Sequence, residues 1–328
     1  MNTFNTKSIF TVAENTFEQT ALDVFRFQFE HQSIYRTFCE GLKRHPNNIS
    51  TLADIPFLPI SFFKTHEIIT NGASAEVVFE SSGTTGAAIS KHLVADSTVY
   101  EESFMRTFRR FYGAPENYCI LALLPSYLER QNSSLVFMAE RLMRASNHPE
   151  NGFFMSDFEN LAARLAALEF KQQKVLLLGV TYALLDFAAL YPMQLNHTIV
   201  METGGMKGRK SEMLRTEVHE VLKQAFALQS IHSEYGMTEL LSQAYSYGNG
   251  IFECTPWMKV LVRDVYNPLS VTALPRTGAL NVIDLANVYA CSFIATEDLG
   301  TILPNNCFEV AGRIDNSDIR GCSLMYAN

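Results

Sequence analysis

The sequence has few charged residues and no long hydrophobic run. Charged side chains make up 18% of the 328 residues and hydrophobic ones 47%, a balance that excludes an intrinsically disordered chain. The most apolar run, residues 175–185, is far shorter than the roughly 20 residues of a membrane-spanning helix. The N-terminus also lacks the apolar core of a signal peptide. We therefore expect a soluble, cytoplasmic globular protein without membrane association.

Paired cysteines and basic clusters are also lacking. The six cysteines form no CxxC pair, which argues against a disulfide framework or a zinc site and favours free thiols. The 17 Gly and 11 Pro follow no period, which excludes collagen-like and low-complexity chains. Lys and Arg total 26 against 34 Asp and Glu, a net charge of −8, and they are scattered. The sequence therefore offers no basic surface of the kind that nucleic-acid binding requires.

The order of expected elements indicates an α/β fold. Apolar residues at helical spacing predict a helix over 14–43, and two prolines predict an extended segment over 55–64. Strands predicted at 76–79, 118–124 and 175–178 alternate with helices, one over 134–145 and one that begins at a Ser156–Glu159 capping box. From residue 257 onward, short strands and turns predict an antiparallel part. This alternation favours a sheet covered by helices.

One polar loop directly follows the first of these strands. Its sequence, SSGTTG, consists of Ser81, Ser82, Gly83, Thr84, Thr85 and Gly86. Glycines let main-chain N–H groups turn inward and hydroxyls add donors, so the loop could cradle an anion. It is neither a Walker A loop nor a GxGxxG motif. By itself, a polar hairpin turn is an equally good interpretation.

Three further motifs follow in the second half of the chain. The first, YGMTE, combines the aromatic Tyr235, the turn glycine Gly236, the hydroxyl of Thr238 and the carboxylate of Glu239. Such groups can stack on a base, bond a phosphate and hold Mg²⁺ through oxygen. The second is DLG, which begins at Asp298, and the third is the segment 312–321, which contains Arg313.

In this order, the four motifs resemble those of the adenylate-forming superfamily, which includes acyl-CoA ligases, firefly luciferase and peptide-synthetase adenylation domains. The resemblance implies the fold of that superfamily's large N-terminal domain: mixed sheets with flanking helices and an antiparallel, β-rich C-terminal part. It also implies ATP and Mg²⁺ as cofactors.

The resemblance further implies a role for each matching residue. The loop from Ser81 to Gly86, with Lys91 behind it, would handle the β and γ phosphates of ATP. The remaining roles are adenine stacking for Tyr235, contact with the α-phosphate and the acyl carboxylate for Thr238, Mg²⁺ ligation for Glu239, ribose binding for Asp298 and Arg313, and a turn near adenine for Gly204 and Gly205.

Superfamily members usually continue after the hinge arginine with a small mobile domain that carries a catalytic lysine. This sequence stops at Asn328, so that small C-terminal domain is expected to be missing. We expect an adenylate-forming core domain over 1–310, whose residues 1–75 form a helical and extended region. Residues 311–328 would be a truncated hinge and a C-terminal tail.

One branch is similar along nearly the whole chain: the acyl-protein synthetases, the type that forms the synthetase subunit of the fatty acid reductase in bacterial bioluminescence. The similarity includes the segments IPFLPISFFK, TGG and PWMKV and the terminal RGCSL. It implies that Cys322 takes the acyl group from an acyl adenylate, with a fatty acid as the expected substrate. The thioester would then pass to an acceptor protein, a reductase or a carrier, and oligomers are compatible with this reading.

Other interpretations remain open at this point. Cys322 could be an idle terminal cysteine, and the enzyme could be a shortened acyl- or aryl-CoA ligase. A non-catalytic, nucleotide-binding scaffold subunit is the alternative from another class. For His92 and His232, a structural role in the core is expected rather than a part in the chemistry.

Overall fold

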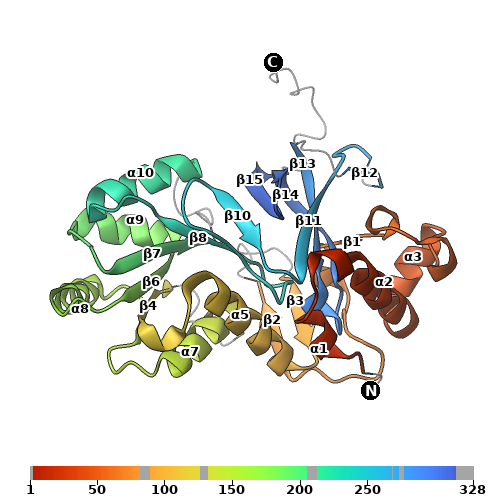
Figure 1. The fold of residues 1–328 in the computed structure, drawn as a ribbon, viewed down its shortest axis with the longest axis horizontal. Coiled ribbons are helices and arrows are strands. Elements are labelled where there is room, and N and C mark those ends of the chain that lie inside the picture. The colour runs from red at the N-terminus through yellow and green to blue at the C-terminus, as the bar shows by residue number, and fades with distance from the viewer. Residues whose placement is uncertain are drawn as a thin grey trace, which may run out of the picture.

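The computed structural model describes residues 3–81, 89–125, 132–204, 213–267, 269–272 and 277–314. Within these ranges, helices pack around one large mixed sheet (Figure 1). The predicted α/β fold is therefore confirmed.

Parallel strands form one half of this sheet. They are β4 (Cys119–Leu123), β5 (Gly152–Phe154), β6 (Val175–Val180), β7 (Thr198–Thr203) and β8 (His232–Tyr235), paired in the order β5-β4-β6-β7-β8. Every residue of β4 and β6 is buried. Their unbroken apolar sequences suit parallel strands that are covered on both faces.

Helices cover this half of the sheet on both sides. They are α5 (Ser97–Tyr112), α7 (Ser134–Ser146), α8 (Phe158–Phe170), α9 (Thr181–Leu190) and α10 (Arg215–Phe226), with the short η3 (Pro115–Asn117) before β4. Figure 1 shows α9 and α10 on one side and α5 and α7 on the other. The ring of Phe187 in α9 packs against those of Phe158 in α8 and Phe226 in α10, with a distance of 5.8 Å between ring centroids in each case. These aromatic contacts join the three helices.

Antiparallel strands form the other half. They are β9 (Ala244–Ser246), β10 (Ile251–Cys254), β11 (Met258–Arg263), β12 (Val271–Thr272), β13 (Thr277–Asp284), β14 (Phe293–Leu303) and β15 (Cys307–Arg313), with η4 (Leu285–Asn287) after β13. The order across the whole sheet is β12-β11-β13-β14-β15-β10-β9-β8-β7-β6-β4-β5. The change from parallel to antiparallel pairing occurs between β8 and β9.

Gly300, the glycine of the DLG motif, is required by the spacing of β14 and β15. A Cβ atom at this position would lie 2.1 Å from the carbonyl oxygen of Glu309. The register of the two strands also shifts between Leu299 and Gly300. A side chain here would push β15 away and disturb the pairing that places Asp298 opposite Arg313.

The N-terminal segment packs helices against the antiparallel half. Its elements are α1 (Thr6–Ile9), α2 (Glu14–His31), α3 (Ser33–Gly41), η1 (Pro46–Asn48) and η2 (Leu52–Asp54). The single helix predicted over 14–43 is wrong, because the chain leaves helical geometry at Gln32. Gln32 is the N-cap of α3, and its side chain accepts a hydrogen bond from the main-chain N–H of Tyr35 at 2.7 Å.

The extended segment predicted over 55–64 is only partly extended. It contains the short strand β1 (Leu58–Pro59), parallel to β14, and then the helical turn α4 (Phe62–Thr65). The predicted capping box at Ser156 is also wrong by one residue. Asp157 caps α8, and its carboxylate accepts from the N–H of Asn160 at 3.2 Å.

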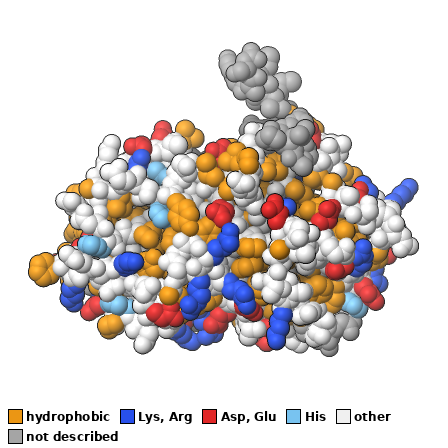
Figure 2. Space-filling model, in the orientation of Figure 1, with side chains coloured by type: hydrophobic (Ala, Val, Ile, Leu, Met, Phe, Trp, Pro, Cys, Tyr) orange, Lys and Arg blue, Asp and Glu red, His pale blue; other side chains and the backbone are white. Residues whose placement is uncertain are grey.

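Charges of both signs lie beside one another on the face that Figure 2 shows. Arg106, Arg109 and Arg110 of α5 line a shallow groove of about 380 Å³ together with Pro256 and Trp257. Each of the three arginines pairs with a glutamate, at 2.7, 3.0 and 3.2 Å respectively. Such exposed pairs contribute about 0–1 kcal/mol each and leave the groove without an unpaired positive charge among its described residues.

Within the described part of the chain, no helix combines the length and the apolar character that crossing a membrane requires.

Candidate functional site

Asp298 contacts two other residues that the motifs predict to bind a nucleotide. Its side chain is 9% exposed. The hydroxyl of Tyr235 donates to Asp298 Oδ2 at 2.8 Å, and Arg313 Nε donates to Oδ1 at 3.3 Å. Tyr235 ends β8, whereas Asp298 and Arg313 face each other across β14 and β15. Three of the predicted motifs therefore meet at Asp298, and its contact with Tyr235 joins positions 63 residues apart.

The ring of Tyr235 lies against an aromatic pair. Its centroid is 5.1 Å from that of Phe308 and 5.8 Å from that of Phe252. Burial and the adjacent carboxylate of Asp298 raise the pKa of Tyr235 well above its usual value. Because the phenol keeps its proton at neutral pH, it acts as a donor to Asp298. Stacking of this ring on adenine stays a prediction.

Glu239 provides a buried carboxylate between β8 and β9. Its residue is 6% exposed. Burial raises the pKa of Glu239, while a hydrogen bond from the Ser90 hydroxyl and the positive charges of Arg313 and Lys64 oppose that rise. A carboxylate that is removed from water in this way gains stability from any cation that approaches it.

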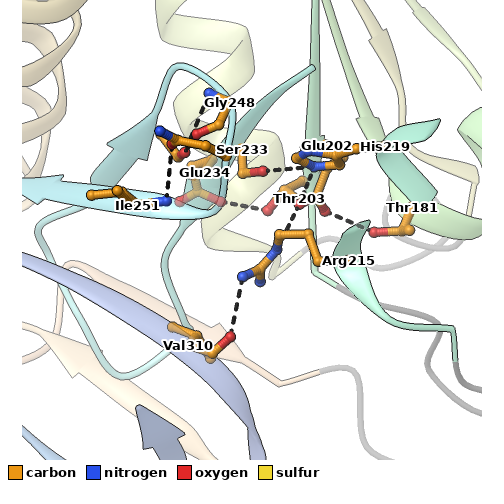
Figure 3. Close-up of polar contacts among 12 residues, drawn as sticks. Thr181, Glu202, Thr203, Arg215, His219, Ser233, Glu234, Gly248, Ile251 and Val310 are labelled. Carbon is orange, nitrogen blue, oxygen red and sulfur yellow. Dashed lines mark hydrogen bonds and ion pairs between the residues drawn. The ribbon is translucent and has the colours of Figure 1, made fainter. Parts of the chain in front are cut away.

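Position 236 requires glycine because a side chain would have no room there, not because the backbone makes an unusual turn. A Cβ atom there would lie 2.2 Å from Glu234 Oε1. Glu234 is itself 8% exposed, and its carboxylate accepts a hydrogen bond from the Thr203 hydroxyl at the end of β7 (Figure 3). The glycine therefore lets the chain after Tyr235 pass close to a second buried acid.

Two strands flank the predicted phosphate loop. β2 (Val77–Glu80) and β3 (Lys91–Val94) pair antiparallel. At their end, the N–H of Ser81 donates to the Ser90 carbonyl, and the N–H of Ser90 donates to Ser81 Oγ, both at 3.0 Å. Lys91 lies 3.7 Å from Glu80, and both side chains are partly exposed. Ser82, Gly83, Thr84, Thr85 and Gly86 lie outside the described residues.

The other predicted positions lie partly outside the described chain. Gly204 directly follows β7 and has a φ of 80°, a left-handed conformation that favours glycine. Gly205 and Cys322 lie outside the described residues. The roles of all these residues, including Lys91 and Thr238, stay predictions.

A buried ionic network at the ends of β6 and β7 was not predicted from the sequence. Glu202 is 5% exposed and accepts from the Thr181 hydroxyl at 2.9 Å and from Arg215 Nε at 3.2 Å (Figure 3). His219 Nε2 lies 3.6 Å from the same carboxylate and 3.2 Å from the hydroxyl of Ser233. Burial alone raises the pKa of Glu202, but these partners outweigh burial and lower it. The carboxylate is therefore ionised at neutral pH.

Arg215 connects this network to the antiparallel half of the sheet. Its Nη1 donates to the carbonyl oxygen of Val310 in β15 at 3.4 Å, and its guanidinium lies 4.9 Å from the ring centroid of Phe252 (Figure 3). Phe252 also contacts Tyr235. Arg215 therefore links α10 to the aromatic ring that packs against Tyr235.

The chain matches the sequence family described as "Acyl-protein synthetase, LuxE" over residues 10–328. It belongs to this family. The resemblance predicted from the four motifs and the terminal segment is therefore confirmed at the level of the family.

The chain is also similar to three known proteins. A long-chain-fatty-acid–luciferin-component ligase from Photorhabdus luminescens is 39% identical over 70 residues, which are 21% of this chain and 60% of that relative. ATP-bound MatB from Rhodopseudomonas palustris is 16% identical with a TM-score of 0.55, covering 75% of this chain and 49% of MatB. An open form of 2-hydroxyisobutyryl-CoA ligase is 14% identical with a TM-score of 0.65, covering 92% of this chain and 70% of that ligase.

At these identities the two solved structures show the fold alone. The chain spans about half the length of MatB and 60% of the luciferin-component ligase. The fold predicted from the resemblance, that of the large domain of adenylate-forming enzymes, is confirmed over most of the chain.

A histidine near this site predicts how stability depends on pH. His232, at the start of β8, contacts the Tyr112 hydroxyl at 3.1 Å. Burial, with the charge of His219, lowers the pKa of His232 to about 4. The unfolded chain therefore binds more protons between about pH 6.5 and pH 4, and stability is lost as the pH falls through that range. Since the side chain is partly exposed, we expect a loss of about 2 kcal/mol from this group.

Denaturant unfolding at pH 7 and pH 4.5 tests this expectation. His232→Gln has no group that titrates in the range, so its stability should fall less than that of the unchanged protein. Asp284, whose pKa burial raises to about 6, contributes an opposite slope that is the same in both proteins. Equal losses of stability in the two proteins would contradict the prediction.

Proposed function

We propose that this protein adenylates a carboxylic acid, expected to be a fatty acid, and transfers the acyl group to its own Cys322 and then to an acceptor protein. In the first step a carboxylate oxygen attacks the α-phosphorus of ATP, the bond from that phosphorus to the bridging oxygen breaks, and pyrophosphate leaves. In the second step the thiolate of Cys322 attacks the acyl carbon. The bond to the phosphate oxygen breaks, and AMP leaves.

The observation that carries this proposal is the contact of Asp298 with Tyr235 and Arg313. In a chain of the acyl-protein synthetase family, Tyr235, Asp298 and Arg313 come together near the buried carboxylate of Glu239. Asp298 offers acceptors for two neighbouring ribose hydroxyls, and Arg313, which is 79% exposed at its side chain, can move toward a nucleotide. We assign adenine contact to Tyr235, Gly204 and Gly205, and phosphate contact to Thr238, Lys91 and the loop from Ser81 to Gly86.

The residues present fit a magnesium ion that arrives with ATP. Mg²⁺ in such sites uses one or two carboxylates together with substrate phosphates, so a single buried carboxylate at Glu239 is a suitable donor set. Among the described residues, no cluster of three or more acidic, histidine or cysteine ligands forms a separate metal site. When bound, Mg²⁺ would neutralise negative charge on the phosphates. Glu239 would hold it, and Thr238 would orient the α-phosphate and the acyl carboxylate.

The described cysteines support Cys322 as the acceptor. The five cysteines in the described ranges are Cys39, Cys119, Cys254, Cys291 and Cys307. Burial raises the pKa of each of these thiols, to about 12 for Cys39 and Cys119. Because the thiolate is the nucleophile, these five side chains are poor acyl acceptors at neutral pH. Cys322 is the sixth cysteine of the chain.

The proposed division of the chain agrees with this role. Residues 1–310 would form the adenylating core, with 1–75 as its helical and extended region, and residues 311–328 would carry the acceptor. The nine residues from Arg313 to Cys322 can span up to about 30 Å when extended. A thiol on such a segment can reach an adenylate held at Asp298.

A serine at Cys322 separates the two steps. Cys322→Ser is expected to retain acid-dependent exchange of pyrophosphate into ATP within about threefold, because adenylation does not use the thiol. After denaturation, this variant should carry no bound labelled acyl group. Cys307→Ser is the matched control, since Cys307 is partly exposed and has no assigned role. Retention of the label by Cys322→Ser would exclude Cys322 as the acceptor.

A panel of fatty and aryl acids in the same exchange reaction identifies the substrate class. A stable acyl-CoA product after addition of coenzyme A would favour a shortened CoA ligase instead. Absence of ATP·Mg²⁺ binding in a thermal-shift assay would favour a non-catalytic scaffold subunit.

A further inference from the structure

Two buried side chains bind the main chain of the YGMTE segment. His92 Nδ1 lies 2.8 Å from the carbonyl oxygen of Thr238, and Asn287 Nδ2 donates to the carbonyl oxygen of Glu239 at 2.8 Å. The two side chains also meet, with His92 Nε2 2.9 Å from Asn287 Oδ1. Both residues are 0% exposed. Adjacent carbonyl groups of the segment are therefore held by one polar pair.

Two further elements of the fold, α4 and α2, contact this pair. His92 belongs to β3, and its ring meets Phe63 of α4 edge-on at 5.6 Å. Asn287 ends η4, and its own carbonyl oxygen accepts from Gln28 of α2 at 3.1 Å. Neither side chain can move without loss of buried hydrogen bonds, which are costly to leave unmade.

Both ring nitrogens of His92 face acceptor oxygens. Burial outweighs the hydrogen bonds to Thr238 and Asn287 and lowers the pKa of His92 to about 4, so the ring is neutral at pH 7. A neutral imidazole has one N–H, and the Thr238 carbonyl can only accept. Asn287 Oδ1 also only accepts, so the single N–H of a neutral ring donates either from Nδ1 to Thr238 or from Nε2 to Asn287.

The same strand also leads back to the predicted phosphate loop. Lys91 precedes His92 and is the first residue of β3. Ser90 lies directly before Lys91 and donates its hydroxyl to the Glu239 carboxylate. β3 therefore contacts Thr238 through His92, and Ser90, the residue before β3, contacts the adjacent Glu239. A shift of the YGMTE segment against β3 would break both contacts.

We propose that His92 and Asn287 are positioning residues, which fix the Thr238 hydroxyl and the Glu239 carboxylate relative to β3 by holding the main chain of the YGMTE segment. This inference rests on the proposed adenylation and deepens it. Neither side chain contacts substrate in this account. Their effect falls on the rate of adenylation, because a misplacement of reacting groups by about 1 Å can lower a rate about 100-fold.

Two variants of His92 and one of Asn287 test the proposal. His92→Leu removes both ring nitrogens at similar size, whereas His92→Asn keeps an amide that can place an N–H close to the position of Nδ1. His92→Leu and Asn287→Leu should lower kcat for acid-dependent ATP–pyrophosphate exchange about 100-fold, with KM for ATP changed less than about threefold. His92→Asn should recover at least about tenfold of that loss.

Thr70→Val is the matched control for a buried hydrogen bond. Thr70 is 1% exposed, and its hydroxyl donates to the carbonyl oxygen of Tyr289 at 3.0 Å. Tyr289 is close to Asn287 in sequence, but this hydrogen bond does not involve the YGMTE segment. Thr70→Val should change kcat by less than about threefold from that of the unchanged protein. Equal kcat values for His92→Leu and Thr70→Val would overturn the positioning role, and so would a failure of His92→Asn to recover activity in a folded protein.

Hydrogen exchange at the amides of residues 237–241 gives a readout that does not need activity. Faster exchange in His92→Leu than in Thr70→Val is expected, and equal exchange would overturn the proposal. If the unchanged protein shows no exchange of pyrophosphate with any acid, the proposed function fails. The amide measurement then still decides whether the two side chains hold the segment.

Discussion

Glutamine in place of Glu239 is expected to lower the rate of acid-dependent ATP–pyrophosphate exchange by about 100- to 1,000-fold. Glutamine has nearly the same shape, so the packing around this 6% exposed residue is retained. The negative charge is lost, and with it the group that we assign to Mg²⁺. Steady-state exchange measured over a range of Mg²⁺ concentrations checks this result, and excess Mg²⁺ should recover part of the activity.

The control is a carboxylate of the same kind on the surface. Glu253→Gln removes a charge that pairs with Arg110 at 3.2 Å on an exposed part of β10. It should change the exchange rate by less than about threefold, because exposed ion pairs contribute little. If Glu239→Gln and Glu253→Gln had the same rate, Glu239 could not be the metal ligand.

Much of the fold could be predicted because its elements follow local patterns. The apolar sequences of β4 and β6 have no polar position, and this pattern alone indicates a parallel strand covered on both faces. The break at Gln32 could not be predicted in the same way. Apolar residues continue at helical spacing on both sides of it, and the cap that starts α3 depends on one side-chain hydrogen bond to Tyr35. Periodicity does not report such a cap.

The candidate site shows the same division between local and distant information. Tyr235, Asp298 and Arg313 could be found because each lies in a motif with a characteristic composition. Their meeting point could not, because it depends on the pairing of β14 with β15 and on the end of β8. The hydrogen bonds that hold the YGMTE segment were also missed.

Single buried polar residues explain these omissions. His92 and Asn287 are 195 positions apart, and each alone looks like an ordinary core residue. The expectation that His92 is structural agrees with its complete burial, but its contact with Thr238 emerges only from the fold. Glu202 offers a weak signal, an acid at the end of a buried strand, whose partners Arg215 and His219 follow on the next helix. A buried acid in a strand end is therefore worth testing for partners on the helix that follows.

Replacement of Asp284 by alanine is expected to lower the free energy of unfolding by about 3–5 kcal/mol. Asp284 is 0% exposed and accepts from the N–H groups of Leu241 and Ser242 at 2.7 and 3.0 Å. It also accepts from the Ser242 hydroxyl at 2.5 Å and from the N–H of Ala286 at 3.2 Å. Alanine would leave these buried donors without an acceptor. Because they lie between the YGMTE segment and η4, the nucleotide site should loosen as well.

A second aspartate with the same number of bonds isolates the effect of burial. Asp54 also accepts four hydrogen bonds, from the N–H groups and the hydroxyls of Ser50 and Thr51, but it lies at the surface. Water can replace the lost acceptor there, so Asp54→Ala should cost only about 1 kcal/mol. Denaturant midpoints of the two variants give the comparison. Equal costs would mean that burial of the donors around Asp284 does not determine its contribution, and that the loop after Glu239 is held by other contacts.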